Sequence, residues 1–196
     1  MGFLSVLSFA HKLVTERLAP GGIAIDATAG TGADTLFLAQ KAGRSGKVFA
    51  FDIQEQALSI TQERLAKAGT EPLAEVKLVH SSHAGMNDII PASVHGKISA
   101  IMFNLGYLPA EGADKELITS PASTLPALDT ALELLAPGGV ITIVVYPGHP
   151  GGDQEARAVE EWCSSLSPLQ AQTVMYRGLQ RSEAPYLIAI ERKKPL

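Results

Sequence analysis

The stretch from Ile23 to Thr35, which reads IAIDATAGTGADT, constrains the fold of this chain more than any other. It begins as a short apolar run, breaks into a turn of small residues with Gly30 and Gly32, and resumes near Ala33 with helical apolar spacing. Strand, glycine turn and helix form the first unit of nucleotide-binding doubly wound folds. Glycine lets the backbone approach a ligand, and the first free N–H groups of the helix point to the same place. The stretch therefore predicts a ligand pocket at this turn.

Predicted strands and helices alternate along the rest of the chain. After the first strand, further strands are expected at 47–52, 74–80, 97–104, 140–146, 169–176 and 185–191. Helices are expected at about 33–42, 54–68, 121–135 and 152–166, with residues 136–139 (APGG) as a sharp connector. This alternation is typical of an α/β fold, with a mainly parallel sheet and helices on both faces. Because only about Arg177 to Ala184 separate the last two strands, no crossover helix fits, and they should pair antiparallel.

The N-terminal residues 1–20 predict an amphipathic helix. Lys12 and Arg17 follow its apolar part, whereas a signal peptide would carry them before it. The apolar residues at helical spacing are Phe3, Leu4, Leu7, Ala10, Leu13, Val14 and Leu18. The 196 residues suffice for one sizeable core, so we expect residues 1–196 to form a single domain.

Composition restricts the compartment and the chemistry. The single cysteine, Cys163, excludes an intrachain disulfide and favours a reducing, cytoplasmic setting, most simply as a small buried residue. The five histidines show no metal-ligand spacing, so no metal site is predicted. A net charge of −4 argues against a non-specific nucleic-acid binder, but it leaves room for local basic patches. Candidate patches are Lys41, Arg44 and Lys47, and Arg177, Arg181, Arg192, Lys193 and Lys194.

Two acids at strand ends narrow the choice of ligand. Asp26 ends the first strand directly before the glycine turn, where it would repel a pyrophosphate but suits a cation. Asp52 ends the second strand, where an acid can accept both ribose hydroxyls. Thr35 stands where a dinucleotide-binding loop carries its third glycine. A nicotinamide-dependent oxidoreductase is therefore the less favoured alternative.

The combination resembles the class I S-adenosylmethionine (SAM)-dependent methyltransferases over nearly the whole chain. Asp26, Gly30 and Gly32 match that family's first motif, and Asp52 matches its ribose acid. The resemblance implies a Rossmann-like, seven-stranded, mainly parallel sheet with an antiparallel last strand. It also implies that SAM is the cofactor and that Ser82 or His83 contacts the adenine. Further expected cofactor contacts are Thr28, Asp34, Thr35, Ile53, Gln54, Asn104 and Gly106.

The residues that follow the fourth strand indicate the class of substrate. Asn104-Leu105-Gly106-Tyr107 is similar to the Asn-Pro-Pro-Tyr motif of amino-group methyltransferases, with Leu105 and Gly106 in place of the prolines. An Asn amide can accept hydrogen bonds from an amine and aim its lone pair. Tyr107 can stack on a base or face the methyl cation.

A longer set of motifs is similar to one small bacterial family. It comprises DATAGTGADT, FDIQ, NLGYLP with Asp114-Lys115, and Tyr146-Pro147-Gly148-His149 with Gly152 and Glu155. Its members were formerly labelled rRNA methylases. The resemblance implies a tRNA methyltransferase that converts the 5-aminomethyl group of (2-thio)uridine at the wobble position to its methylaminomethyl form. The expected substrate contacts are Tyr107, Leu108, Pro109, Asp114, Lys115, Tyr146, Gly148 and His149.

The expected nucleophile is a primary alkyl amine, which must lose a proton before it attacks. His149 is the first candidate base, because a loop histidine at a strand exit faces the ligand crevice. Tyr107, Tyr146 and Asp34 are further candidates, and Asn104, Tyr107 and His149 form the predicted catalytic set.

Several alternatives stay open on the sequence. An rRNA or a small-molecule amine could replace tRNA as the substrate, and a non-catalytic binding module could retain the fold. The anticodon region of a tRNA needs a wide footprint. An incompletely covered N-terminal helix could provide it through a homodimer, or could simply cap the sheet.

Overall fold

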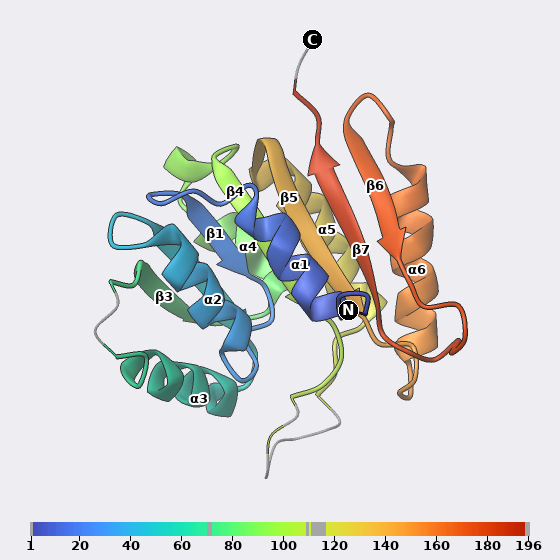
Figure 1. The fold of residues 1–196 in the computed structure, drawn as a ribbon, viewed down its shortest axis with the longest axis horizontal. Helices are drawn as coiled ribbons and strands as arrows, with labels where there is room; N and C mark the ends of the chain where they lie inside the picture. Colours follow the sequence, from blue (N-terminus) through green and yellow to red (C-terminus); the bar gives the residue numbers. More distant parts are fainter. Residues whose placement is uncertain (1, 70–71, 109, 111–116, 195–196) are drawn as a thin grey trace.

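One continuous sheet organises the molecule. In the computed structural model the described residues are 2–69, 72–108, 110 and 117–194. Their seven strands are ordered β3-β2-β1-β4-β5-β7-β6 (Figure 1). The strands are β1 (Ile23–Asp26), β2 (Lys47–Asp52), β3 (Glu75–His80), β4 (Ile98–Asn104), β5 (Leu135–Val145), β6 (Ala171–Tyr176) and β7 (Tyr186–Arg192). The α-helices are α1 (Val6–Thr15), α2 (Ala33–Ala42), α3 (Glu55–Ala66), α4 (Met86–Ile89), α5 (Pro121–Leu134) and α6 (Gly152–Ser165). Short 3₁₀ turns lie at η1 (His83–Gly85) and η2 (Ala92–Val94).

The pairing of the strands confirms the predicted mainly parallel sheet. Strand β1 runs parallel to both β2 and β4, and β4 runs parallel to β5. Strand β7 is inserted between β5 and β6 and runs antiparallel to both. Val145 at the end of β5 pairs with Tyr186 at the start of β7. The connection that precedes β7 therefore reaches the edge of the sheet where the parallel strands end.

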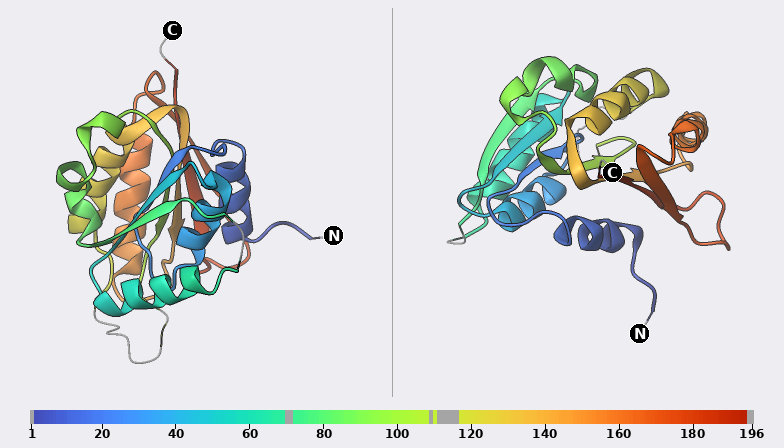
Figure 2. Two further views of the ribbon diagram at one scale, coloured as in Figure 1. Left: turned by 90° about the vertical axis from the view of Figure 1, so that its left-hand side faces the viewer. Right: turned by 90° about the horizontal axis from the view of Figure 1, so that it is seen from above.

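Helices cover both faces of the sheet, as Figures 1 and 2 show. One cluster of buried side chains joins the sheet to α1 and α2, including Val14, Leu38 and Ala100. The other joins the opposite face to α5 and α6 and includes Leu128 and Val159. Strands β1, β4 and β5 are apolar along nearly their whole length, which is typical of strands that are buried on both faces.

The connector predicted at residues 136–139 is wrong in one respect, because these residues lie inside β5. Ile98 pairs with Leu135 and Ala100 pairs with Val140, so the segment between them is a bulge in a continuing ladder. A Cβ at Gly139 would lie 2.9 Å from Leu135 Cγ and 3.0 Å from the Ile98 carbonyl oxygen. Glycine is needed there because β4 and β5 approach closely.

The N-terminal helix is shorter than the predicted span of residues 1–20. Helix α1 begins after Ser5, whose side chain accepts a hydrogen bond from the N–H of Ser8 and caps the first turn. Its inner face is buried at Ala10 and Val14, whereas Phe3, before the helix, is 98% exposed and Leu7 is 38% exposed. The amphipathic character is confirmed, but the apolar residues at its start are uncovered. Within the described ranges, no helix is long and apolar enough to cross a membrane.

Candidate active site

The polar residues singled out at strand ends meet at one edge of the sheet. Asp26 ends β1, Asp52 ends β2 and Asn104 ends β4, and these parallel strands lie side by side. Tyr146 follows the end of β5. In open α/β sheets this carboxyl edge is where ligands bind, at the point where the strand order reverses. Here the reversal falls between β1 and β4.

The glycine turn is tied to the end of β2. The N–H of Gly30 donates to Asp52 Oδ2 at 2.9 Å, and the N–H of Gln54 donates to Asp52 Oδ1 at 2.9 Å. Gly30 has a φ of +53° and Gly32 a φ of +76°, a backbone region that favours glycine. A Cβ at Gly32 would lie 2.8 Å from the Cα of Thr61 in α3. The backbone conformation of the turn therefore favours glycine at both positions, and close packing against α3 requires it at Gly32 as well.

Asp26 is fully buried beneath this turn. Its Oδ1 accepts a hydrogen bond from the N–H of Thr28 at 3.1 Å, and its Oδ2 accepts one from Thr35 Oγ1 at 2.6 Å. Burial raises the pKa of Asp26 to about 7, the nearby charge of Asp34 adds to the increase, and the two hydrogen bonds oppose it. Asp26 therefore holds the turn from below.

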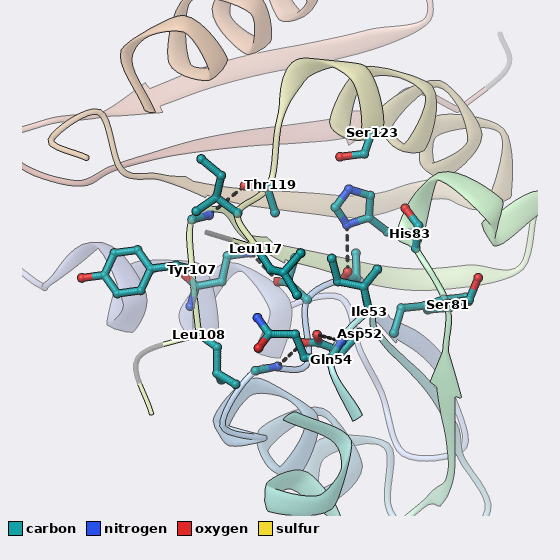
Figure 3. A pocket seen from close by; sticks show the side chains of 18 residues that line it. Asp52, Ile53, Gln54, Ser81, His83, Tyr107, Leu108, Leu117, Thr119 and Ser123 are labelled. Carbon is teal, nitrogen blue, oxygen red and sulfur yellow. Dashed lines mark hydrogen bonds between the residues drawn. The ribbon is translucent and has the colours of Figure 1, made fainter. Parts of the chain in front are cut away.

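A first pocket lies between the glycine turn, the end of β2 and the segment after β3 (Figure 3). In Figure 3, Asp52 and Gln54 lie on its lower side, with His83 and Ser123 above them and Tyr107 on the left. The predicted residues that line it are Thr28, Gly30, Asp52, Ile53, Gln54, Ser82, His83, Asn104, Gly106, Tyr107 and Leu108. Lining residues that the sequence reasoning missed are Ala27, Phe51, Ser81, Leu117, Ile118, Thr119 and Ser123.

His83 lines this pocket, and one of its ring nitrogens has a backbone partner. Its Nδ1 lies 3.1 Å from the Ala27 carbonyl oxygen. Because a carbonyl oxygen can only accept, Nδ1 carries the proton and donates a hydrogen bond to this oxygen. Burial lowers the pKa of His83, which keeps the ring neutral. Nε2 is buried and has no hydrogen-bond partner among the described residues.

A second pocket of about 350 Å³ adjoins the first and lies over the exits of β4 and β5. Both pockets are lined by Thr28, Gly30, Asn104, Gly106 and Tyr107. The predicted residues found only in the second pocket are Asp34, Tyr146, Gly148 and His149. Residues that were missed are Ala29, Thr31, Ala33, Leu105, Glu183 and Pro185. Glu183 and Pro185 come from the connection before β7, which reaches the pocket because β7 starts beside the end of β5, and no local sequence signal marks them.

Asn104 is held at the wall between the pockets. Its backbone N–H donates to Thr28 Oγ1 at 2.8 Å, and its Nδ2 lies 3.5 Å from Asp34 Oδ2. Burial raises the pKa of Tyr146 and the charge of Asp34 adds to this, whereas the Asn104 side chain opposes it. Asn104, Asp34 and Tyr146 thus form one polar group on the floor of the second pocket.

The turn after Asn104 is supported from behind by a buried acid. The N–H of Gly106 donates to Thr119 Oγ1 at 2.8 Å, and Thr119 Oγ1 donates to Glu155 Oε2 at 2.7 Å. Glu155 in α6 is 2% exposed, and its Oε1 accepts from Thr124 Oγ1 at 2.7 Å. This chain of bonds fixes the backbone between the two pockets.

His149 lines the second pocket beside this turn. Its Nδ1 lies 3.0 Å from the Pro150 carbonyl oxygen, which places the proton on Nδ1 and the lone pair on Nε2. Nε2 is buried without a hydrogen-bond partner in the described part of the chain. The rings of Tyr107 and His149 are perpendicular to each other, with their centroids 6.1 Å apart.

Some predicted site residues lie elsewhere. Asp26, Gly32 and Thr35 line neither pocket and support the turn from below or behind. Pro109, Asp114 and Lys115 lie outside the described residues. No group of three or more His, Cys, Asp or Glu side chains suited to a metal ion is found in the described ranges.

Comparisons with known proteins agree with this geometry. A family model described as "Putative rRNA methylase" matches residues 48–191. A tRNA (mnm(5)s(2)U34)-methyltransferase, chloroplastic, from Arabidopsis thaliana is 37% identical over 191 residues, which is 94% of this chain and 68% of the relative. The ribosomal RNA small subunit methyltransferase H of Brevibacillus brevis is 27% identical over 72% of this chain but only 46% of its own length.

A solved structure extends the comparison to the cofactor. A protein from Streptococcus mutans is 35% identical to this chain. It is described as a "putative methyltransferase" and was solved in complex with S-adenosylhomocysteine (SAH), the demethylated form of SAM. The match has a TM-score of 0.84 and covers 97% of this chain and 99% of that one. Fold, family model and SAH-bound neighbour agree on SAM as the cofactor. This chain therefore belongs to the rRNA methylase family of class I SAM-dependent methyltransferases.

Proposed function

We propose that this protein methylates the 5-aminomethyl nitrogen of (2-thio)uridine at the wobble position of tRNA. The Arabidopsis relative carries that modification in its name and matches nearly the whole of this chain. The small subunit rRNA methyltransferase relative matches a smaller share of both proteins at lower identity. An rRNA or small-molecule amine substrate is the second candidate, and the family description is its support.

The observation that carries the proposal is the wall shared by the two pockets. Asn104, Gly106 and Tyr107 line both, so a ligand in one pocket reaches a ligand in the other across these residues. Methyl transfer is a direct displacement, and it needs donor and acceptor held in line with water excluded. Two adjoining pockets with a rigid shared wall meet this requirement.

The residues of the first pocket fit the cofactor. Asp52 is a carboxylate at the strand end where ribose hydroxyls are bound, and its two backbone hydrogen bonds orient it. Ser82 and His83 line the same pocket after the end of β3, where the family places its adenine contact. We assign the ribose to Asp52 with Ile53 and Gln54, the adenine to Ser82 and His83, and the methionine part to Thr28, Gly30 and Gly106. When bound, SAM supplies a methyl group on a positively charged sulfur.

On the acceptor side, we assign Asn104 and Tyr107 to orienting the amine and the base. The amide oxygen of Asn104 can accept an N–H bond and direct the nitrogen lone pair toward the first pocket. Tyr107 is 46% exposed, so its ring is free to stack on a uracil. Leu108 and Gly148 extend this wall. Pro109, Asp114 and Lys115 remain proposed contacts on the strength of the family motif alone.

His149 is the proposed base for the substrate ammonium. Its hydrogen bond to the Pro150 carbonyl favours the tautomer with a lone pair on Nε2. That nitrogen is buried beside Gly106 and Gly152, so a small shift of the loop must expose it to the amine. The proton then passes from the substrate nitrogen to Nε2 before the nitrogen attacks.

We propose that the whole chain acts as one cytoplasmic methyltransferase domain on tRNA. The buried Cys163 is compatible with a reducing compartment. The connection before β7, which reaches the second pocket at Glu183 and Pro185, also carries Arg177 and Arg181. These two positive charges suit the phosphate backbone of a tRNA. We further propose a homodimer through the uncovered residues Phe3, Leu4 and Leu7. Sedimentation should give a dimer for the natural protein and a monomer for Leu7→Glu.

The test of the function uses tRNA from cells that lack the final methylation. Incubation with labelled SAM should place the label on the methylaminomethyl nucleoside, and tRNA with an unmodified wobble uridine should stay unlabelled. Ribosomal RNA is the competing substrate in the same assay. Label on rRNA alone would favour the second candidate.

A further inference from the structure

We propose that Asp34, held by His11, is the site that recognises the positive charge of the substrate amine. This inference rests on the proposed function and deepens it. It assigns Asp34 to the acceptor pocket and makes His11 of helix α1 a positioning residue. The pair selects alkyl ammonium substrates against uridines whose C5 substituent is neutral.

The position of Asp34 supports this role. Asp34 lines the second pocket together with Asn104, Tyr146 and His149. Asp34 is 8% exposed, so its carboxylate interacts with a ligand charge with little screening by water. A nucleotide whose amine lies against Asn104 has its nitrogen near Asp34 Oδ2, which is 3.5 Å from the Asn104 amide.

His11 fixes the other oxygen of Asp34. His11 Nε2 lies 2.6 Å from Asp34 Oδ1, which leaves Oδ2 on the Asn104 side. The imidazole is stacked on the Phe37 ring of α2, with the centroids 3.9 Å apart and the planes within 7°. The contact sets the orientation of the carboxylate, so α1 contributes to the site as well as covering the sheet.

The proposed deprotonation by His149 is compatible with this arrangement. Asp34 and Asn104 hold the ammonium, and His149, which lines the same pocket, removes one proton from it. Attack of the neutral amine on the methyl group of the sulfonium gives a methylammonium directly, so Asp34 binds substrate and product alike. The pair therefore acts on binding rather than on the displacement.

The experiment compares the affinities of two tRNAs in the presence of SAH, one with a 5-aminomethyl wobble uridine and one with an unmodified wobble uridine. The natural protein should prefer the aminomethyl tRNA by about 10- to 100-fold, the scale of a charged hydrogen bond. Asp34→Asn should reduce this ratio to near one and leave the affinity for SAH unchanged. Asp88→Asn, an exposed acid on α4, is the matched control and should keep the preference.

A pair of His11 variants gives a second, independent readout. The amide of His11→Gln can still donate a hydrogen bond to Asp34, so this variant should keep the preference for the aminomethyl tRNA, whereas His11→Ala lacks the contact and should reduce the preference. A preference that persists in Asp34→Asn, or a loss of SAH binding in that variant, would overturn the inference. Failure of the natural protein to methylate the aminomethyl tRNA would instead refute the proposed function.

Discussion

The backbone N–H of Gly30 donates a hydrogen bond to Asp52 Oδ2 at 2.9 Å and so joins the glycine turn to the end of the neighbouring strand. The other carboxylate oxygen accepts from the N–H of Gln54. One side chain thus orders both segments that border the first pocket, and it still has lone pairs to offer a ligand.

Asp52→Ala should therefore weaken cofactor binding. Loss of charged hydrogen bonds to a ligand costs about 1.5–3 kcal/mol, which corresponds to about a 10- to 100-fold higher Kd for SAH. Titration calorimetry measures the Kd of SAH directly. Glu55→Ala, one turn away on the exposed surface of α3, is the control and should bind SAH normally. Equal affinities for the two variants would refute the ribose assignment.

His149→Ala should separate chemistry from binding. The variant should retain SAH affinity and lose methyl transfer by about 10²- to 10⁴-fold, the usual contribution of a general base. Because free amine becomes more abundant as pH rises, activity should recover in part at high pH. His95→Ala removes a histidine that contacts the Ile90 carbonyl, outside both pockets, and should leave turnover unchanged. Unchanged turnover in His149→Ala would remove this residue from the mechanism.

Glu155→Ala should loosen the wall between the pockets. The substitution leaves two buried threonine hydroxyls, at Thr119 and Thr124, without their acceptor. An unsatisfied buried group costs about 1–3 kcal/mol, and for a domain of this size each kcal/mol lowers Tm by about 2–4 °C. Thermal denaturation of this variant and of Glu161→Ala, on the exposed face of the same helix, measures the difference. Catalytic activity at low temperature should also fall in Glu155→Ala alone.

Asp26 should make the stability of the protein depend on pH. Its folded-state pKa, about 7, lies above the ordinary value of 3.8, so the folded chain binds the proton more tightly than the unfolded chain. The free energy of unfolding therefore falls as pH rises from about 4 to about 7, and the lower value persists above that range. Asp26→Asn cannot ionise and lacks this decline. Urea denaturation at pH 5 and pH 8 should show the natural protein losing stability relative to the variant, and a constant difference would contradict the assignment.

Much of the architecture could be predicted because it depends on local patterns. The apolar run before the glycine turn predicted β1 and the helix α2 after it, and the short final connection predicted that the last two strands pair antiparallel. The connector predicted at residues 136–139 is wrong because proline and glycine, which usually end a strand, here lie within β5. Here they form a bulge against β4, and only the partner strand reveals it.

The site was less predictable where it depends on contacts distant in sequence. His11 and Asp34 are 23 residues apart, and neither belongs to a pattern that would pair them. Glu183 and Pro185 line the second pocket because β7 starts beside the end of β5, a tertiary relation without a local signal. Glu155 belongs to a family motif, but its support of Thr119 and Gly106 depends on tertiary hydrogen bonds that no local pattern predicts.

The insertion of β7 between β5 and β6 has a consequence for biosynthesis. The described residues that line the first pocket all precede residue 124, whereas the second pocket is closed by residues up to 185. Since a chain leaves the ribosome from its N-terminus, the residues of the first pocket emerge before those of the final hairpin. The second pocket is completed only when the last strand has emerged and has entered the gap between β5 and β6.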